Sequence, residues 1–244
     1  MEEIKQNALE KVEKKNKVKK KKDITIKTNK KGRHVIPFMN FLRILLLPIF
    51  YLIFPCRFYG NKKIKDGPCV YISNHKTLLD IVYPATTTWE GVHYVAKNQL
   101  STTPVVGAVA RKCKTIFVNR DGSDVRALLD CFKCLKNGDK IIIFPEGTRN
   151  KTSEIMLPFK QGAAVMAIKT KTPVVPIVVY SKTKAFRCTH VLIGEPMELS
   201  EYYDKKLSEE ELAAVDNMLR DKLIAMHKEH TEYLEAKKKK GKKA

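Results

Sequence analysis

A histidine and an aspartate stand five positions apart in the stretch Ser73-Asn74-His75-Lys76-Thr77-Leu78-Leu79-Asp80. This pairing is typical of a general base and the carboxylate that orients it. On a continuous helix, five steps of about 100° leave two side chains roughly 140° apart, so they would not meet. We therefore expect His75 in the turn that leaves a strand, and Asp80 in the first turns of the next helix. Alternatively, His75 is a satisfied turn residue or one ligand of an incomplete metal site.

Polar residues also follow two other predicted strands. Arg120 comes after Ile116-Phe117-Val118, and Glu146-Gly147-Thr148-Arg149 comes after an apolar run that ends at Phe144. In an α/β sheet the carboxyl ends of the strands meet at one edge, where ligands bind. Arginine there suits a phosphate, because guanidinium is planar, offers a bidentate fork and stays charged. For either arginine alone, a surface ion pair is the alternative.

Strand and helix patterns alternate from Cys69 onward, which predicts an α/β fold with a largely parallel or mixed sheet flanked by helices. The strand candidates are Cys69–Ile72, Thr115–Val118, Lys140–Phe144, Val174–Val179 and His190–Ile193. Helical spacing covers Asp124–Lys136 and Phe159–Thr170, and a last helix follows a capping box that begins at Ser208. On that helix we expect His227 and His230 to lie on a solvated face.

The charge of the chain is strongly positive: 47 basic against 26 acidic residues give a net charge of +21 over 244 residues. Such an excess indicates a polyanionic partner, either nucleic acid or an anionic membrane surface. The lysines gather in residues 1–34 and 231–244, which we expect to be disordered tails. They lack interleaved aromatic residues and any recognised nucleic-acid motif, so no nucleic-acid partner is expected, although a basic binding protein without chemistry remains the non-enzymatic alternative.

Residues 35–57 are almost entirely apolar and form the candidate membrane segment. Pro48 interrupts the run, so we expect two short helices that form a hairpin within one leaflet, with Arg43 reaching the headgroups. A buried core hairpin is the alternative. Residues 58–230 then form the main domain.

The six cysteines predict reduced core thiols in a cytosol-facing protein, because no secretory signal precedes them. Cys131 and Cys134 form a CxxC pair, but it lies inside a helical pattern and has no second pair to complete a zinc site. We therefore expect no metal.

Four sequence blocks, in order, resemble those of the glycerolipid acyltransferase superfamily, and most closely the 1-acyl-sn-glycerol-3-phosphate acyltransferases. The resemblance covers roughly residues 35–193. The blocks are NHx₄D at Asn74, His75 and Asp80; F-x-N-R at Phe117, Asn119 and Arg120; FPEGTR at Phe144 to Arg149; and V-P-I at Val175, Pro176 and Ile177.

The resemblance implies an acyltransferase domain that acylates the sn-2 hydroxyl of lysophosphatidic acid to phosphatidic acid, in phospholipid biosynthesis. Glycerol-3-phosphate or another lysophospholipid is the alternative acceptor. The resemblance also implies an acyl-CoA or acyl carrier protein co-substrate, no cofactor, and membrane association with the site at the cytoplasmic face. The implied roles are catalysis for His75 and Asp80, phosphate binding for Arg149, Arg120 and Lys97, and shaping of the site for Asn74, Glu146, Gly147 and Thr148.

Overall fold

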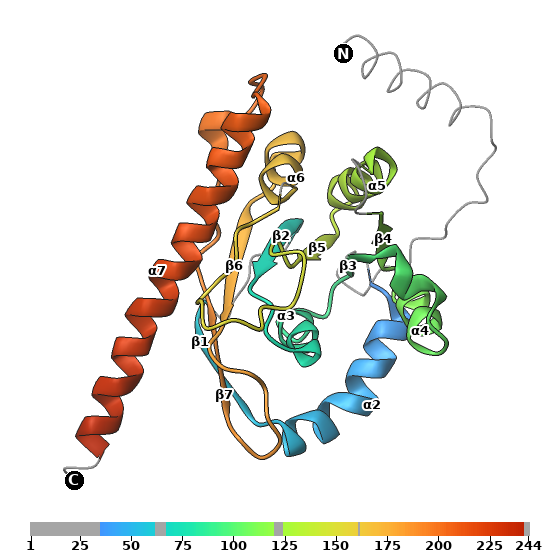
Figure 1. Ribbon diagram of the computed structural model, residues 1–244. Coiled ribbons are helices and arrows are strands. Elements are labelled where there is room, and N and C mark those ends of the chain that lie inside the picture. Colours follow the sequence, from blue (N-terminus) through green and yellow to red (C-terminus); the bar gives the residue numbers. More distant parts are fainter. Residues whose placement is uncertain (1–34, 62–66, 120–123, 161, 242–244) are drawn as a thin grey trace.

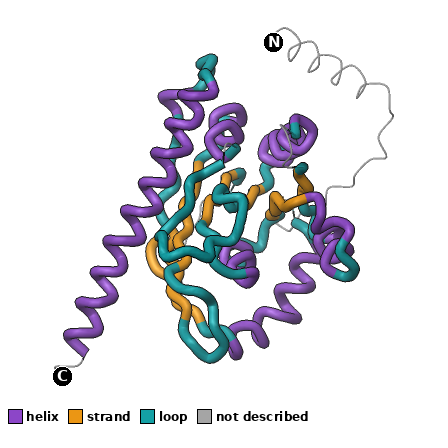
Figure 2. The backbone as a smooth tube through the Cα atoms, in the orientation of Figure 1, coloured by secondary structure: helices purple, strands orange, loops and turns teal. Residues whose placement is uncertain are grey.

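The computed structural model describes residues 35–61, 67–119, 124–160 and 162–241. The predictions for the tail at residues 1–34 and for Arg120 therefore lie outside the described residues. Figure 1 shows a central sheet with helices on both sides of it, and Figure 2 shows the same layering by type of structure. The predicted α/β fold is thereby confirmed.

Seven strands form one mixed sheet in the order β1-β7-β6-β2-β5-β3-β4. Strands β2 to β6 run parallel to one another, β7 is antiparallel to β6, and β1 is parallel to β7. The carboxyl ends of β2, β5, β3 and β4 therefore lie at one edge. The strands are β1 (Cys56–Gly60), β2 (Cys69–Ser73), β3 (Val92–Lys97), β4 (Ile116–Val118), β5 (Lys140–Ile143), β6 (Val174–Val179) and β7 (Thr189–Ile193).

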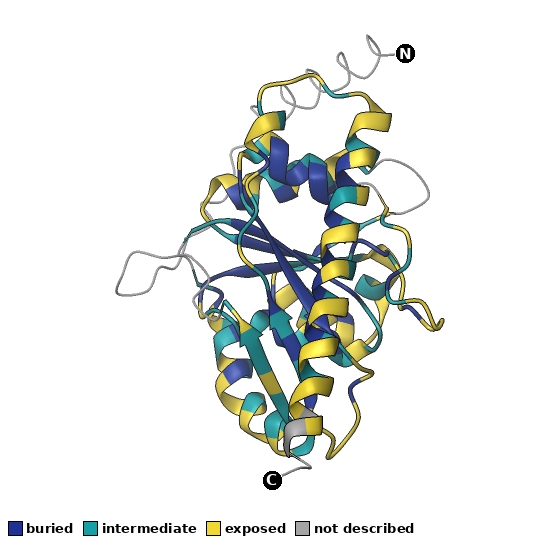
Figure 3. Cartoon of the chain, turned by 90° about the vertical axis from the view of Figure 1, so that its left-hand side faces the viewer, coloured by how far each residue is buried: buried dark blue, intermediate teal, exposed yellow. Residues whose placement is uncertain are grey.

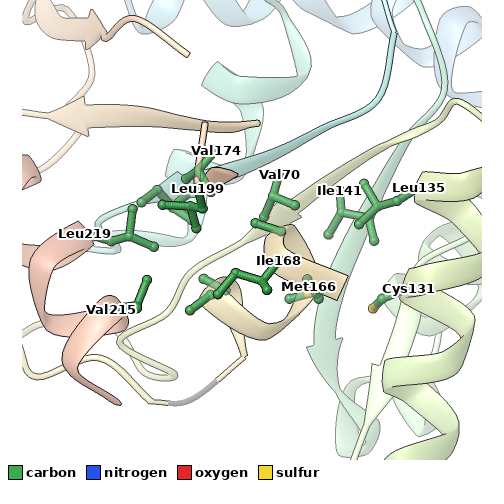
Figure 4. Packing of buried hydrophobic residues seen from close by; sticks show 14 of the residues in the cluster. Val70, Cys131, Leu135, Ile141, Met166, Ile168, Val174, Leu199, Val215 and Leu219 are labelled. Atoms are coloured by element: carbon green, nitrogen blue, oxygen red, sulfur yellow. The ribbon is translucent and has the colours of Figure 1, made fainter. Parts of the chain in front are cut away.

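One face of the sheet is covered by α5 (Val125–Lys136), α6 (Ala163–Thr170) and α7 (Glu209–Gly241). Side chains alternate along each strand, so Val70 and Ile72 of β2 point to this face. The residues that pack there come from all three helices and from β2, β5 and β6 (Figure 4). Burial is deepest in the strands behind α7, as Figure 3 shows.

The opposite face packs against α2 (Pro37–Ile53) and α3 (Val82–Ala85), with Tyr71 of β2 at the centre of the contact. Helix α4 (Val106–Lys112) and the 3₁₀ helices η1 (Leu78–Ile81), η2 (Asn98–Thr102) and η3 (Ser200–Tyr202) complete the chain. Because both faces of the central strands are covered, the sequences of these strands are nearly continuous apolar runs.

Helix α2 differs from the predicted two-helix hairpin, because one helix continues through Pro48. Side chains on both sides of the proline, including Met39 before it and Phe50 after it, pack on the domain and hold the helix together. Within the described part of the chain, no helix has both the length and the apolar character needed to cross a membrane.

Arg43 does not reach toward headgroups, and that prediction was wrong. It lies on the inward face of α2 and is only 5% exposed. Its guanidinium donates to the Asn40 side chain and to the carbonyl of Glu90 at 3.5 Å, and lies 5.9 Å from the centre of the Trp89 ring.

The C-terminal helix also differs from the sequence prediction. Helix α7 continues to Gly241, so residues 231–241 are helical rather than disordered. His230 is 9% exposed and packs edge-on against Tyr59 with 4.4 Å between ring centres, while His227 lies against Tyr180. The predicted solvated face is thus an aromatic contact, because α7 lies across strands contributed by distant parts of the chain.

Candidate active site

His75 and Asp80 meet in the loop after β2, as their spacing predicts. His75 lies two residues beyond the end of β2, and Asp80 lies in η1. The distance from His75 Nδ1 to Asp80 Oδ2 is 3.5 Å, which is close enough for an ion pair but longer than an ordinary hydrogen bond. Asp80 is fully buried, whereas 16% of the His75 side chain is exposed. The imidazole therefore has one nitrogen beside a buried carboxylate and a ring that solvent can reach.

Asp80 also holds the loop that carries His75. Its Oδ2 accepts hydrogen bonds of 2.6 Å from the backbone N–H groups of Lys76 and Thr77, and its Oδ1 accepts one from the Thr77 hydroxyl at 2.6 Å. Because these donors fix the carboxylate, Asp80 is oriented before any substrate arrives.

Phe144 and Glu146 support His75 from the loop that follows the neighbouring strand β5. The rings of His75 and Phe144 stack with 4.3 Å between their centres. Glu146 is 2% exposed, and its carboxylate accepts from the backbone N–H of His75 and of Leu157, each at 2.8 Å. Burial raises the pKa of Glu146, and these two hydrogen bonds oppose the rise. Glu146 thus joins the loop after β2 to the long connection between β5 and α6. This is consistent with the shaping role that the resemblance implies for it.

Gly147 closes the turn after β5. Its N–H donates to the carbonyl of Phe144 at 2.9 Å, and its φ of +67° lies in the left-handed region. A side chain is strained there, which explains the glycine in this block. Thr148 follows it and is exposed.

Asn74 is buried and joins the end of β2 to the end of β6. Its side-chain amide donates to the carbonyl of Val179 at 2.9 Å and accepts from the N–H of Val179 at 2.8 Å. This two-way pairing fixes the chain immediately before His75. Asn74 therefore positions His75 through the backbone.

Two of the three candidate phosphate-binding residues are described, and both lie at or after the end of a strand at this edge of the sheet. Arg149 is exposed in the loop after β5, and Lys97 is exposed at the end of β3, where it pairs in register with Val118 of β4. Two cations that the sequence blocks did not single out are present too. Lys76 is half-buried beside His75, and the exposed Lys160 donates its backbone N–H to Pro145 at 2.8 Å.

A cavity of about 490 Å³ opens beside Phe144 and extends under the sheet edge. Such a volume is typical of ligand pockets, which range from about 300 to 1,000 Å³. Its lining is mainly apolar and includes Leu212 of α7, with Asn119, Gly147 and Lys160 also in the wall. Apolar residues from β3, β4, β5, α5 and α6 line it: Val95, Val118, Ala127, Leu128, Ile143, Val165 and Met166.

Asp216 of α7 is the buried acidic group in the wall of this cavity, and it is 3% exposed. One carboxylate oxygen accepts from the N–H of Ala164 at 3.0 Å, at the start of α6, while the other has no hydrogen-bond partner in the described residues. Burial raises the pKa of Asp216 to about 6.

Comparison with known families agrees with this arrangement. The family model described as Acyltransferase matches residues 55–180, which is half of the chain and includes all four blocks. The chain belongs to the Acyltransferase family.

Curated relatives of this acyltransferase-family chain carry the name 1-acyl-sn-glycerol-3-phosphate acyltransferase. A chloroplastic 1-acyl-sn-glycerol-3-phosphate acyltransferase of Brassica napus is 38% identical over 121 residues, covering 48% of this chain and 34% of the relative. The Helicobacter pylori enzyme of that name is 34% identical over 49% of this chain and 52% of its own length. A putative 1-acyl-sn-glycerol-3-phosphate acyltransferase of Caenorhabditis elegans is 30% identical over 185 residues, covering 71% of this chain and 64% of the relative. The chain thus spans about half the length of the curated relatives it matches.

The crystal structure of the 1-acyl-sn-glycerophosphate (LPA) acyltransferase PlsC from Thermotoga maritima has the same fold. It aligns with a TM-score of 0.57 and 24% identity, over 79% of this chain and 78% of that one. The likeness supports the arrangement of the sheet and its helices.

Proposed function

We propose that this protein transfers an acyl chain from a thioester to the sn-2 hydroxyl of 1-acylglycerol-3-phosphate, forming phosphatidic acid. The observation that carries the proposal is the His75 and Asp80 pair, whose imidazole stacks on Phe144, a residue in the wall of an apolar cavity. The names of the relatives support the choice of acceptor.

In the proposed reaction the acceptor supplies the nucleophile. As its hydroxyl oxygen attacks the thioester carbonyl carbon, His75 takes the hydroxyl proton, and Asp80 stabilises the imidazolium that forms. The carbon–sulfur bond then breaks, and the departing thiolate takes the proton from His75. The balance is one ester and one thiol from one alcohol and one thioester. No step requires a group outside the two substrates and this pair.

Each substrate has a matching surface. The acyl chain of the donor, acyl-CoA or acyl carrier protein, fits the apolar cavity, because burial of each methylene gains about 0.8 kcal/mol. The phosphate of the acceptor fits the cations around the sheet edge, with Arg149 and Lys97 as first candidates and Arg120 following β4.

Helix α2 supports the proposed membrane association. Large apolar side chains cover its outer face, and five of them are at least half exposed. Such a face favours insertion at the boundary between headgroups and acyl chains, and the net charge of +21 favours an anionic surface. The five are Phe41, Ile44, Leu45, Ile49 and Leu52. We place the site at the cytoplasmic face of that membrane.

The deciding experiment uses the purified full chain, labelled acyl-CoA and a panel of acceptors. We expect transfer to 1-acylglycerol-3-phosphate at a higher kcat/KM than to glycerol-3-phosphate or a neutral lysolipid. His75→Ala should lower kcat by about 10²–10⁴-fold, because a positioned base contributes that much. Circular dichroism should show the fold of this variant unchanged. An active His75→Ala protein would refute the mechanism, and vesicle or nucleic-acid binding without transfer would favour the non-enzymatic alternative.

A further inference from the structure

Three residues that bind metals well converge at the amino edge of the sheet, opposite the edge that carries His75. They are His93 near the start of β3, Cys134 in the last turn of α5, and Asp139 directly before β5. Strands β3 and β5 are neighbours, with His93 in register with Ile141. The fold therefore brings the three side chains together from separate elements.

The geometry of the cluster is compact. The imidazole, thiol and carboxylate ligand atoms all lie within 4.8 Å of one another, and His93 Nε2 is 3.2 Å from Asp139 Oδ2. In a tetrahedral zinc site with bonds of about 2.0–2.3 Å, ligand atoms lie roughly 3.3–3.7 Å apart. Small side-chain rotations are enough to reach that spacing.

The hydrogen bond at the other ring nitrogen orients His93 for metal binding. Nδ1 lies 2.9 Å from the carbonyl of Lys114, and since a carbonyl only accepts, Nδ1 carries the hydrogen. In the neutral imidazole this leaves the lone pair on Nε2, which faces Asp139. Metal-binding histidines are commonly fixed in this way by a backbone carbonyl.

We propose that His93, Cys134 and Asp139 bind a zinc-type divalent transition metal ion. A thiolate, an imidazole and a carboxylate form a donor set that suits Zn²⁺ and does not suit Mg²⁺ or Ca²⁺. His93 is buried while Cys134 and Asp139 are half-buried, so an ion can enter and a water can complete the coordination. The ion would tie α5 to β3 and β5.

Without a metal, the same residues form an ion pair. Asp139 and Cys134 raise the pKa of His93 to about 10, although burial opposes this rise. Metal binding needs a neutral imidazole and a thiolate, so an ion competes with protons for these groups, and the experiment has to distinguish the metal-bound state from the metal-free one. Chemically, the thiolate of Cys134 is the group that distinguishes them, since only metal binding gives a sulfur–metal bond.

The CxxC pair supplies a matched control. Cys131 lies three residues before Cys134 on the same helix but faces the core, where it is 3% exposed. The full chain, stripped with a chelator and titrated with CoCl₂, should give one cobalt per chain and a thiolate-to-cobalt charge-transfer band. Cys134→Ala should abolish the band and Cys131→Ala should retain it. Zinc added to the stripped chain should raise the unfolding midpoint in the same proteins that show the band.

Two outcomes overturn the proposal: a stripped wild-type chain that gives no stoichiometric band, or a band that survives in Cys134→Ala, as binding by the exposed Cys188 would produce. Asp139→Asn keeps the side-chain volume and tests the site if Cys134→Ala fails to fold; it should lower cobalt affinity at least tenfold, and unchanged affinity counts against the site. Acyl transfer by the His75 edge is measured separately, so failure here leaves the proposed function untouched.

Discussion

The carboxylate of Asp80 holds the loop that carries His75 and also lies beside the imidazole that we propose as the base. Two backbone N–H groups and the hydroxyls of Thr77 and Thr183 donate to it, and the imidazole of His75 lies 3.5 Å away. Hydrogen bonds to an ionised group are each stronger than neutral ones, so this loop is held firmly around the carboxylate.

Asp80→Asn should lower kcat by about 10²-fold or more, because an amide neither carries the charge that stabilises the imidazolium nor accepts on both sides. Its NH₂ group would face backbone donors, at a stability cost of about 1–3 kcal/mol. Measuring kcat and the urea midpoint checks both effects. Thr77→Val is the matched control: it removes one donor and keeps the charge, so kcat should fall less than tenfold. Equal losses in the two variants would contradict the role assigned to Asp80.

The raised pKa of Asp216 predicts that the stability of the folded protein changes with pH in a definite direction. Burial raises its pKa to about 6, so the folded state keeps a proton that the unfolded chain releases near pH 4. The resulting contribution to stability is complete below about pH 4 and is lost as the pH rises through about 6.

Asp216→Asn stays neutral throughout this range. The free energy of unfolding of the variant, relative to the wild type, should therefore increase between pH 4 and pH 7 by an amount on the order of 2–3 kcal/mol. Urea unfolding of both proteins at several pH values measures this difference. Parallel curves would show that the carboxyl is not perturbed.

At the scale of elements, α2 has two faces with opposite roles. The inner face is anchored to the domain through Arg43 and Met39, while the outer face exposes large apolar groups such as Ile44 and Leu52. The proposed membrane contact and the contact with the domain can be tested separately, because no side chain of α2 belongs to both faces.

Ile44→Ser with Leu52→Ser should weaken binding to anionic vesicles at least tenfold while the urea midpoint stays within error, since both side chains are solvent-exposed. Arg43→Ala should do the reverse: vesicle binding stays, and stability falls by about 1–3 kcal/mol as the contacts to Glu90 and Trp89 are lost. Vesicle sedimentation and urea unfolding give both readouts. Loss of vesicle binding in Arg43→Ala alone would assign the membrane contact elsewhere.

Sequence patterns identified most elements and missed those whose stability comes from distant partners. Strands β1 and β3 went unpredicted, because CRFYG and VHYVAK alternate too weakly to stand out. Similarly, the aromatic partners of His227 and His230 are Tyr180 and Tyr59, which no helical periodicity could reveal. Local pattern is a weak guide wherever tertiary contact decides burial.

For the whole molecule, the candidate site was predictable where it depends on residues close in sequence. The meeting of His75 with Asp80 follows from their spacing. The apolar cavity does not, because its walls come from β3, α5, α6 and α7, and only the assembled layers place them around one space. For the same reason the support of His75 by Glu146 was not visible in the sequence.

Leu212 offers a test of the cavity at this scale. Leu212→Trp should fill the end formed by α7 and lower kcat/KM for the longest acyl donors at least tenfold while short donors react normally, because each excluded methylene costs about 1–3 kcal/mol. A series of acyl-CoA chain lengths measures the shift. Asn217→Trp, at an exposed position on the same helix, should leave the profile unchanged. A profile that does not move in Leu212→Trp would place the chain outside this cavity.

The wall that α7 contributes to the cavity has an evolutionary consequence. In the proposed reaction the base and its carboxylate lie in the loop after β2, whereas Leu212 and Asp216 of α7, far along the polypeptide, line the cavity proposed for the acyl chain. On this proposal, mutations in α7 would change which fatty acids enter a lipid while His75 and Asp80 remain intact. A lineage with this architecture would then adjust the composition of its membranes, for instance to a new growth temperature, by drift in one helix and without a step at which the enzyme is inactive.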